Sequence, residues 1–79
     1  MIKSYTFEQE TEMKPSGEVS SKKYLVNSHK VNLKIFSILY QKVYNNNQYK
    51  QLYTMDNKFT SDYYSSRKIE AHYFKPEIS

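Results

Sequence analysis

Two alternating segments joined by a tight turn constrain the fold of this chain more than any other feature. Residues 2–13 alternate in polarity, a period of two that is typical of a strand with one face in water. The four residues from Lys14 to Gly17 predict a turn, because proline fixes φ at the second turn position and glycine suits the fourth. We therefore expect an N-terminal β-hairpin. The alternating residues are Tyr5, Phe7 and Met13 on the apolar parity and Thr6, Glu8, Glu10 and Glu12 on the polar parity.

The residues after the turn agree with this alternation. With Met13 opposite Glu18, the register places Phe7 opposite Tyr24 on one face. Acidic and basic side chains then share the other face, and each such cross-strand pair is worth about 0.2–1 kcal/mol. Because a slip by one residue would reverse every side chain, the agreement in parity supports the hairpin.

The next segment predicts a helix that ends near Tyr44. Its apolar residues recur in groups at helical spacing, Ser28 or Asn32 is suited to cap its start, and the asparagines at 45–47 end it. Residues 30–35 also alternate in polarity, so a long strand over 30–44 is the alternative. The helical groups are Ile35 and Phe36, then Ile38, Leu39 and Tyr40, then Val43 and Tyr44.

The apolar arc of this helix is wide. Lys30, Lys34, Ser37 and Gln41 form a narrow polar stripe, and Lys42 lies apart from it. A helix with so little polar surface is covered on more than one side. The sheet covers one side of the helix, and we expect a second contact to cover the remaining apolar surface, such as the second subunit of a homodimer.

The last third predicts a second hairpin. Residues 49–55 alternate in polarity, and so do residues 67–74. Between them, residues 56–58 are expected to start a turn, and residues 60–66 to form a loop.

These elements predict a single α+β domain over residues 1–79, with a flexible tail at 76–79. The expected order is ββαββ: an N-terminal β-hairpin, one central helix and a C-terminal β-hairpin. The strands form an antiparallel sheet with the helix on one face. A small all-β barrel is the alternative if the central segment is a strand.

The chain has little material for a core. A folded domain of this mass has a surface of roughly 5,000 Å², and the absence of cysteine excludes disulfide bonds. Nine Tyr and four Phe must supply much of the apolar contact. Because each buried tyrosine hydroxyl needs a hydrogen-bond partner, we expect most tyrosines to be half-buried packing residues and the rest to form a recognition face.

Composition also bears on location and origin. A cysteine-free chain suits a reducing cytoplasm, and no apolar run is long enough to span a membrane. Lys, Asn, Tyr and Ile are plentiful, a bias that AT-rich codons produce and that is frequent in bacteriophages and mobile elements. We expect a cytoplasmic protein, located in the host cytoplasm if a phage encodes it.

The sequence contains no pattern that predicts catalysis or a cofactor. His29 and His72 lack a carboxylate or a nucleophile at convincing spacing, and they form no metal-ligand set. A single glycine cannot build a phosphate-binding loop. The acidic face of the first strand is expected to be solvated and paired with Lys22 and Lys23. We predict a protein that is not an enzyme and uses no metal or cofactor.

Charge is distributed unevenly along the chain. The 37 residues from Val19 to Met55 contain six lysines and no acidic residue, so the net charge of +4 resides in the middle. A stretch of one sign favours association with a polyanion or an acidic protein surface.

Two functions fit these features. The first is an inhibitor or modulator of the host-takeover or anti-defence type, which docks on a host protein or a protein–nucleic acid complex through tyrosines flanked by lysines. The second is a small basic protein that binds nucleic acid directly, through lysine–phosphate contacts and tyrosine–base stacking. The scarcity of arginine tells against the second. The candidate partner-binding residues are Lys22, Lys23, Lys30, Lys34, Lys42, Lys50, Tyr49, Tyr53, Tyr63, Tyr64 and Arg67.

Overall fold

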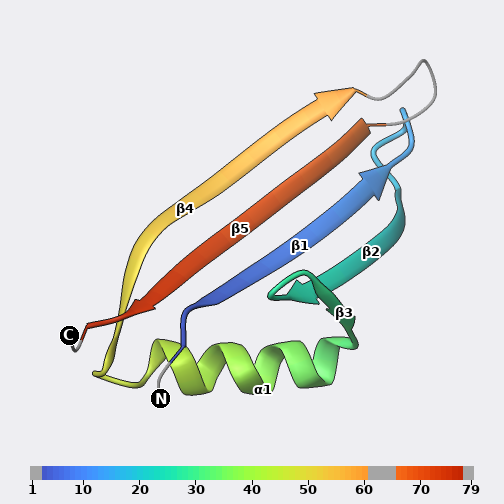
Figure 1. The fold of residues 1–79 in the computed structure, drawn as a ribbon. Coiled ribbons are helices and arrows are strands. Elements are labelled where there is room, and N and C mark those ends of the chain that lie inside the picture. Colours follow the sequence, from blue (N-terminus) through green and yellow to red (C-terminus); the bar gives the residue numbers. More distant parts are fainter. Residues whose placement is uncertain (1–2, 61–65, 78–79) are drawn as a thin grey trace.

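The described residues of the chain form five strands and one helix (Figure 1). The computed structural model describes residues 3–60 and 66–77, apart from the side chains of residue 53 and residues 55–60. The elements are β1 (Tyr5–Met13), β2 (Val19–Val26), β3 (His29–Val31), α1 (Leu33–Tyr44), β4 (Tyr49–Thr60) and β5 (Ser66–Pro76).

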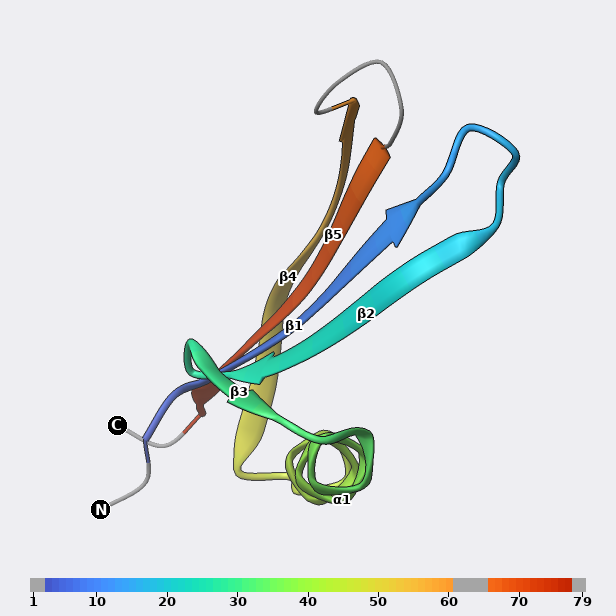
Figure 2. The ribbon, with the colours of Figure 1, turned by 90° about the vertical axis from the view of Figure 1, so that its right-hand side faces the viewer.

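The strands form one antiparallel sheet in the order β3-β2-β1-β5-β4. The two hairpins join where β1 pairs with β5, so the first and last strands of the chain are neighbours in the middle of the sheet. The helix lies against one face, near one end of the strands (Figures 1 and 2). The predicted α+β fold is confirmed. The sheet is open, so the all-β barrel is wrong.

The first hairpin forms at the predicted turn but in a different register. The backbone N–H of Gly17 donates a hydrogen bond to the carbonyl of Lys14 and closes the turn. The φ of Gly17 is 92°, which is typical of the extra residue, or β-bulge, that follows a tight turn. Ser20 is a second extra residue, because Glu12 pairs with Ser21 and Met13 pairs with Val19, which leaves Ser20 without a partner in the register. Phe7 consequently lies opposite Val26 and not Tyr24. A shift of two residues keeps every side chain on its predicted face.

The segment before the helix contains a short strand that the sequence pattern did not predict. Asn27 and Ser28 have φ values of 50° and 69°, the positive angles that a two-residue hairpin turn requires at both central positions. The Asn27 side chain also accepts a hydrogen bond of 2.8 Å from the backbone N–H of Thr6. Of the two caps considered, Asn32 is the N-cap, since its side chain accepts from the N–H of Ile35 at 2.8 Å.

The helix ends at Tyr44, as predicted, with Asn45 as its C-cap. A long strand over 30–44 is therefore wrong. No helix among residues 3–60 and 66–77 has the length and apolar character needed to cross a membrane.

The second hairpin is longer than predicted. The expected turn at 56–58 is wrong, because β4 continues to Thr60 and the backbone of residues 53–60 pairs with β5. Leu52 is an extra residue that interrupts the alternation expected for residues 49–55. Cross-strand pairing thus overrides the turn propensity of Asp and Asn. Thr60 and Ser66, predicted to begin and end a loop, are instead the last residue of β4 and the first residue of β5, and residues 61–65 lie outside the described residues.

The C-terminal end is held to the sheet as far as Glu77. Pro76, where the tail was expected to begin, is the last residue of β5 and lies opposite Tyr49. The backbone N–H of Glu77 then donates to the carbonyl of Gln48 at 2.6 Å. Residues 78–79 lie outside the described residues.

Aromatic rings around Phe7 form most of the core. Phe7 is fully buried, and the rings of Phe36, Tyr40 and Phe74 meet it edge-on with centroids 5.2 to 5.8 Å away. The tyrosines at the edge of this cluster are half-buried, as predicted. The remaining members are Val26, Val43, Tyr5, Val31, Leu39 and Tyr49.

The helix covers only part of the sheet, and the strands project beyond it (Figure 2). The molecule therefore measures 47 × 23 × 18 Å, and its accessible surface of 5909 Å² exceeds the roughly 5,000 Å² expected for a compact domain of this mass.

Removing the Phe7 ring should unfold much of the population. We expect Phe7→Ala to lower the free energy of unfolding by about 3–5 kcal/mol, because the lost ring leaves a cavity between sheet and helix. Urea unfolding followed by circular dichroism measures this loss. Val19→Ala, at a side chain that is 45% exposed, is the control and should change stability by about 0.5 kcal/mol or less. A Phe7→Ala loss no larger than that of the control would contradict this account of the core.

The helix cap offers a second test. Asn32→Ala should cost about 1 kcal/mol, because the N–H of Ile35 loses its acceptor, whereas Asn32→Ser should retain most of the stability. Asn47→Ala, at an exposed residue beyond the helix, is the matched control. Equal unfolding midpoints for the Asn32→Ala and Asn47→Ala variants would show that the cap contributes nothing.

Candidate binding surfaces

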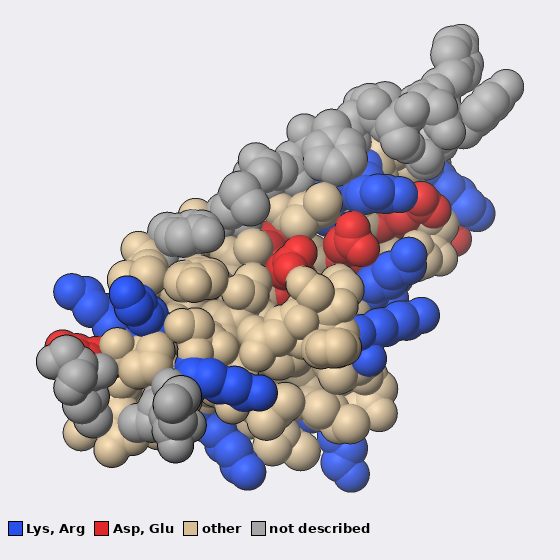
Figure 3. Space-filling model, in the orientation of Figure 1, with Lys and Arg blue, Asp and Glu red and all other residues tan. Residues whose placement is uncertain are grey.

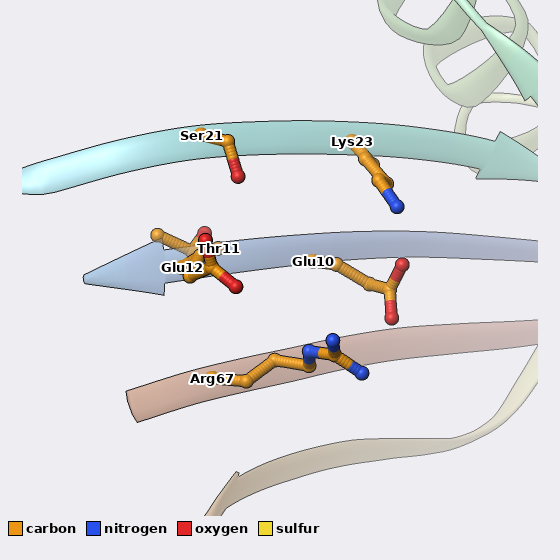
Figure 4. A pocket seen from close by; sticks show the side chains of 6 residues that line it. All are labelled: Glu10, Thr11, Glu12, Ser21, Lys23 and Arg67. Carbon is orange, nitrogen blue, oxygen red and sulfur yellow. The ribbon is translucent and has the colours of Figure 1, made fainter. Parts of the chain in front are cut away.

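Two of the predicted partner-binding residues lie beside carboxylates on the face of the sheet opposite the helix. In the strand register, Lys23 of β2 lies opposite Glu10 of β1, and Arg67 of β5 lies opposite Glu12. Both cationic side chains point toward β1, where they line a shallow pocket of about 140 Å³ with Ser21 and the two glutamates (Figure 4). Their charges are therefore compensated locally, which leaves less positive potential for a partner.

The acidic side chains form a row across the middle of this face, with basic side chains on both sides of it (Figure 3). The hydroxyl of Ser20 contacts one end of this row. It donates to the backbone carbonyl of Glu12 at 3.1 Å and to Oε1 of Glu12 at 3.3 Å. Of the two lysines expected to pair with the acidic face, Lys23 lies opposite Glu10 in the register. Lys22 instead lies opposite Thr11, so the alternation of the strand places it on the helix side of the sheet.

The other predicted lysines do not form one continuous surface. Lys30 is exposed on β3, and Lys34 and Lys42 are exposed on α1. Lys50 lies apart from them on β4, directly opposite Lys75 of β5. Lys34 and Lys42 thus share the helix and Lys30 precedes it on β3, whereas Lys22, Lys23, Lys50 and Arg67 belong to other parts of the sheet.

The predicted aromatic residues are distributed differently from the lysines. Tyr49 packs against the core, where its ring meets that of Tyr5 edge-on with centroids 5.7 Å apart. It is half-buried and is not presented for stacking on a base. The side chain of Tyr53, and all of Tyr63 and Tyr64, lie outside the described residues.

An exposed apolar surface on α1 is the feature that the residue predictions missed. Ile35 and Ile38 are 45% and 46% exposed, and the helical repeat places them beside Lys34 and Lys42. We call these four residues the outer helix surface. The helix sequence contains no acidic residue, so the surface combines apolar side chains with positive charge only. The wide apolar arc predicted a second contact but not which residues would be left open.

A ladder of three rings runs along another side of the same helix. Phe36, Tyr40 and Tyr44 are four residues apart, and successive rings are stacked with interplanar angles of 12° and 19°. Tyr44 at the end of the ladder is 61% exposed. The side of the ladder toward the projecting sheet borders a pocket of about 270 Å³, which we call the corner pocket. Its lining residues are Gln9, Phe36, Tyr40, Glu70 and His72.

The two histidines have different surroundings. His29 is exposed on β3, and the ring of His72 packs edge-on against Tyr40 with centroids 5.4 Å apart. Within the described part of the chain, no group of three or more His, Cys, Asp or Glu side chains could hold a metal ion.

Comparison with protein-family models, with curated proteins and with solved structures finds no match to this chain. The chemistry of the outer helix surface and of the corner pocket is therefore the basis for assigning a function.

The ring ladder makes stability depend on pH. Burial raises the pKa of the Tyr40 phenol, and the negative charge that Tyr44 acquires at high pH raises it further. Above about pH 10 the unfolded chain releases this proton more readily than the folded chain does, so the free energy of unfolding should fall as the pH rises. We expect the wild type to lose more stability than Tyr40→Phe between pH 9 and pH 11, measured by urea unfolding. Parallel losses in the two proteins would contradict this role for Tyr40.

Proposed function

We propose that this chain is a non-enzymatic binding protein that docks on another protein through the outer helix surface and inhibits or modulates it. The observation that carries the proposal is the exposure of Ile35 and Ile38 on a helix whose charged side chains are all lysines. Apolar side chains that alternate with one sign of charge suit a partner that is apolar at its centre and acidic at its rim.

The geometry of the helix suggests the shape of the partner site. Lys34, Ile38 and Lys42 follow one another at intervals of four residues, and Ile35 lies one turn before Ile38. A helix that presents anchors at such spacing fits into a groove, and the isoleucines would enter it while the lysine ammonium groups stay at its edge. We infer a shallow apolar groove bordered by Asp or Glu side chains.

The nucleic-acid alternative receives less support from these surfaces. Binding to phosphates does not require exposed isoleucines, and Lys23 and Arg67 lie opposite glutamates in the strand register. Tyr49, one of the proposed stacking residues, packs in the core. A protein partner would contact both the exposed isoleucines and the lysines of the helix, and it therefore accounts for more of this surface than a nucleic acid does.

Self-association through the outer helix surface is also less favourable. Two copies that met symmetrically at this surface would bring the lysines of both helices together with no carboxylate from either helix. Like charges at close range oppose such a homodimer. We propose instead a host protein as the partner, in line with an amino-acid composition of the kind that AT-rich phage genes produce.

The proposal is tested by charge substitutions on two sides of the helix. Ile35→Asp combined with Ile38→Asp should weaken capture of a protein partner from host lysate at least tenfold, because two apolar anchors are lost and two carboxylates would face an acidic rim. Leu33→Asp, at a side chain that is 53% exposed and lies on a different side of α1, is the control and should retain the partner.

The readouts distinguish folding from binding. Both variants should unfold at nearly the same urea concentration as the wild type, since the substituted side chains are exposed. Capture that survives the double substitution, or captured material that disappears on nuclease treatment, would overturn the protein-docking proposal.

A further inference from the structure

The corner pocket has the composition of a small ligand site. Two aromatic rings of α1, from Phe36 and Tyr40, form its helix wall, and Gln9 and Glu70 line it from the sheet. Gln9 and Glu70 are directly opposite each other in β1 and β5, so the amide and the carboxylate come from neighbouring positions on one face. A volume of about 270 Å³ is larger than the roughly 150 Å³ that accommodates benzene in an engineered cavity.

The lining residue His72 contributes no positive charge. Its Nδ1 atom is buried and has no hydrogen-bond partner among the described residues. A neutral imidazole can leave Nδ1 as a bare acceptor, whereas an imidazolium would bury an unpaired, charged N–H at that position. We therefore assign the ring proton to Nε2 in a neutral imidazole.

Glu70 is then the only charged group among the described residues that line the pocket. Lys68 and Lys22 lie on the same face one row farther out, on either side of Thr11, about 7 Å along the strands from the row of Glu70. They are not part of the lining. The carboxylate favours a positive charge beside it, and the two aromatic rings supply an apolar wall that an organic cation can contact.

We propose that the corner pocket binds an organic cation, either an ammonium or a guanidinium group. The carboxylate of Glu70 pairs with the cation, the rings of Phe36 and Tyr40 contact its apolar surface, and the amide of Gln9 is a further hydrogen-bond partner. The pocket lies on a different side of α1 from the outer helix surface. The inference stands without the docking proposal.

Two sources could supply this chemistry. A quaternary ammonium compound would use the rings most, because it has no N–H to donate, and a guanidinium from an arginine side chain would pair with Glu70 through two N–H groups. Titration of the ¹⁵N-labelled protein with choline and with N-acetylarginine amide distinguishes them. Their neutral analogues, 3,3-dimethylbutan-1-ol and N-acetylcitrulline amide, report on shape without charge.

We expect saturable amide shifts at Gln9, Glu70 and His72 with one of the two cations, with Kd of about 1–10 mM for so small a group. The neutral analogue should bind roughly tenfold more weakly or not at all. Glu70→Gln should weaken binding of the cation by roughly tenfold. Glu18→Gln makes the same charge change in the exposed turn and should leave binding unchanged.

Each outcome decides the matter. A response to choline alone assigns the pocket to quaternary ammonium compounds, and a response to the arginine derivative assigns it to a guanidinium. Absence of shifts at these residues with either cation, equal binding of the neutral analogues, or unchanged binding in the Glu70→Gln variant would overturn the proposal. Failure of the helix substitutions described above would leave this result unaffected.

Discussion

The contacts of the Phe7 ring hold the two hairpins and the helix together. Phe7 lies on β1, the strand through which the two hairpins meet, and its ring touches Phe36 and Tyr40 from the helix and Phe74 from β5. The core is small because α1 covers only one end of the sheet. Beyond that end, backbone pairing and partly exposed side chains hold the strands. A domain with no disulfide therefore depends on one aromatic cluster for most of its cooperative packing.

Parity was predictable from the sequence, whereas register and strand length were not. Alternation assigned Phe7 to the buried face, and that assignment survived because the extra residues Gly17 and Ser20 shift the register by two in total. Nothing in the alternation reveals a bulge, since it depends on local backbone angles. The strand at residues 29–31 depends on positive φ at Asn27, an angle that asparagine tolerates but does not require. The length of β4 depends on its partner β5 and not on its own residues.

The candidate surfaces were less predictable, because charge along a sequence does not specify which face a side chain occupies. Lys23 belongs to an acid-free stretch of sequence, yet β1 places Glu10 beside it. Tyr49 has a hydroxyl that suits an interface, yet its ring packs against Tyr5 at the edge of the core. The corner pocket joins β1, α1 and β5, and no motif spans such separated positions. Only the wide apolar arc of the helix gave a usable signal, since it required more cover than one sheet provides.

The outer helix surface is difficult to explain by stability alone. Isoleucine is stiff at χ1 and has a lower helix propensity than the straight-chain residues, so two exposed isoleucines weaken an isolated helix relative to Lys, Gln or Leu. Ile35 and Ile38 are nearly half exposed and lie outside the Phe7 cluster, so the core gains little from them. A helix whose outer positions served only solubility would carry polar helix formers there. Retention of β-branched apolar side chains between Lys34 and Lys42 is understandable if a partner buries them, because rigid side chains lose less conformational entropy on binding.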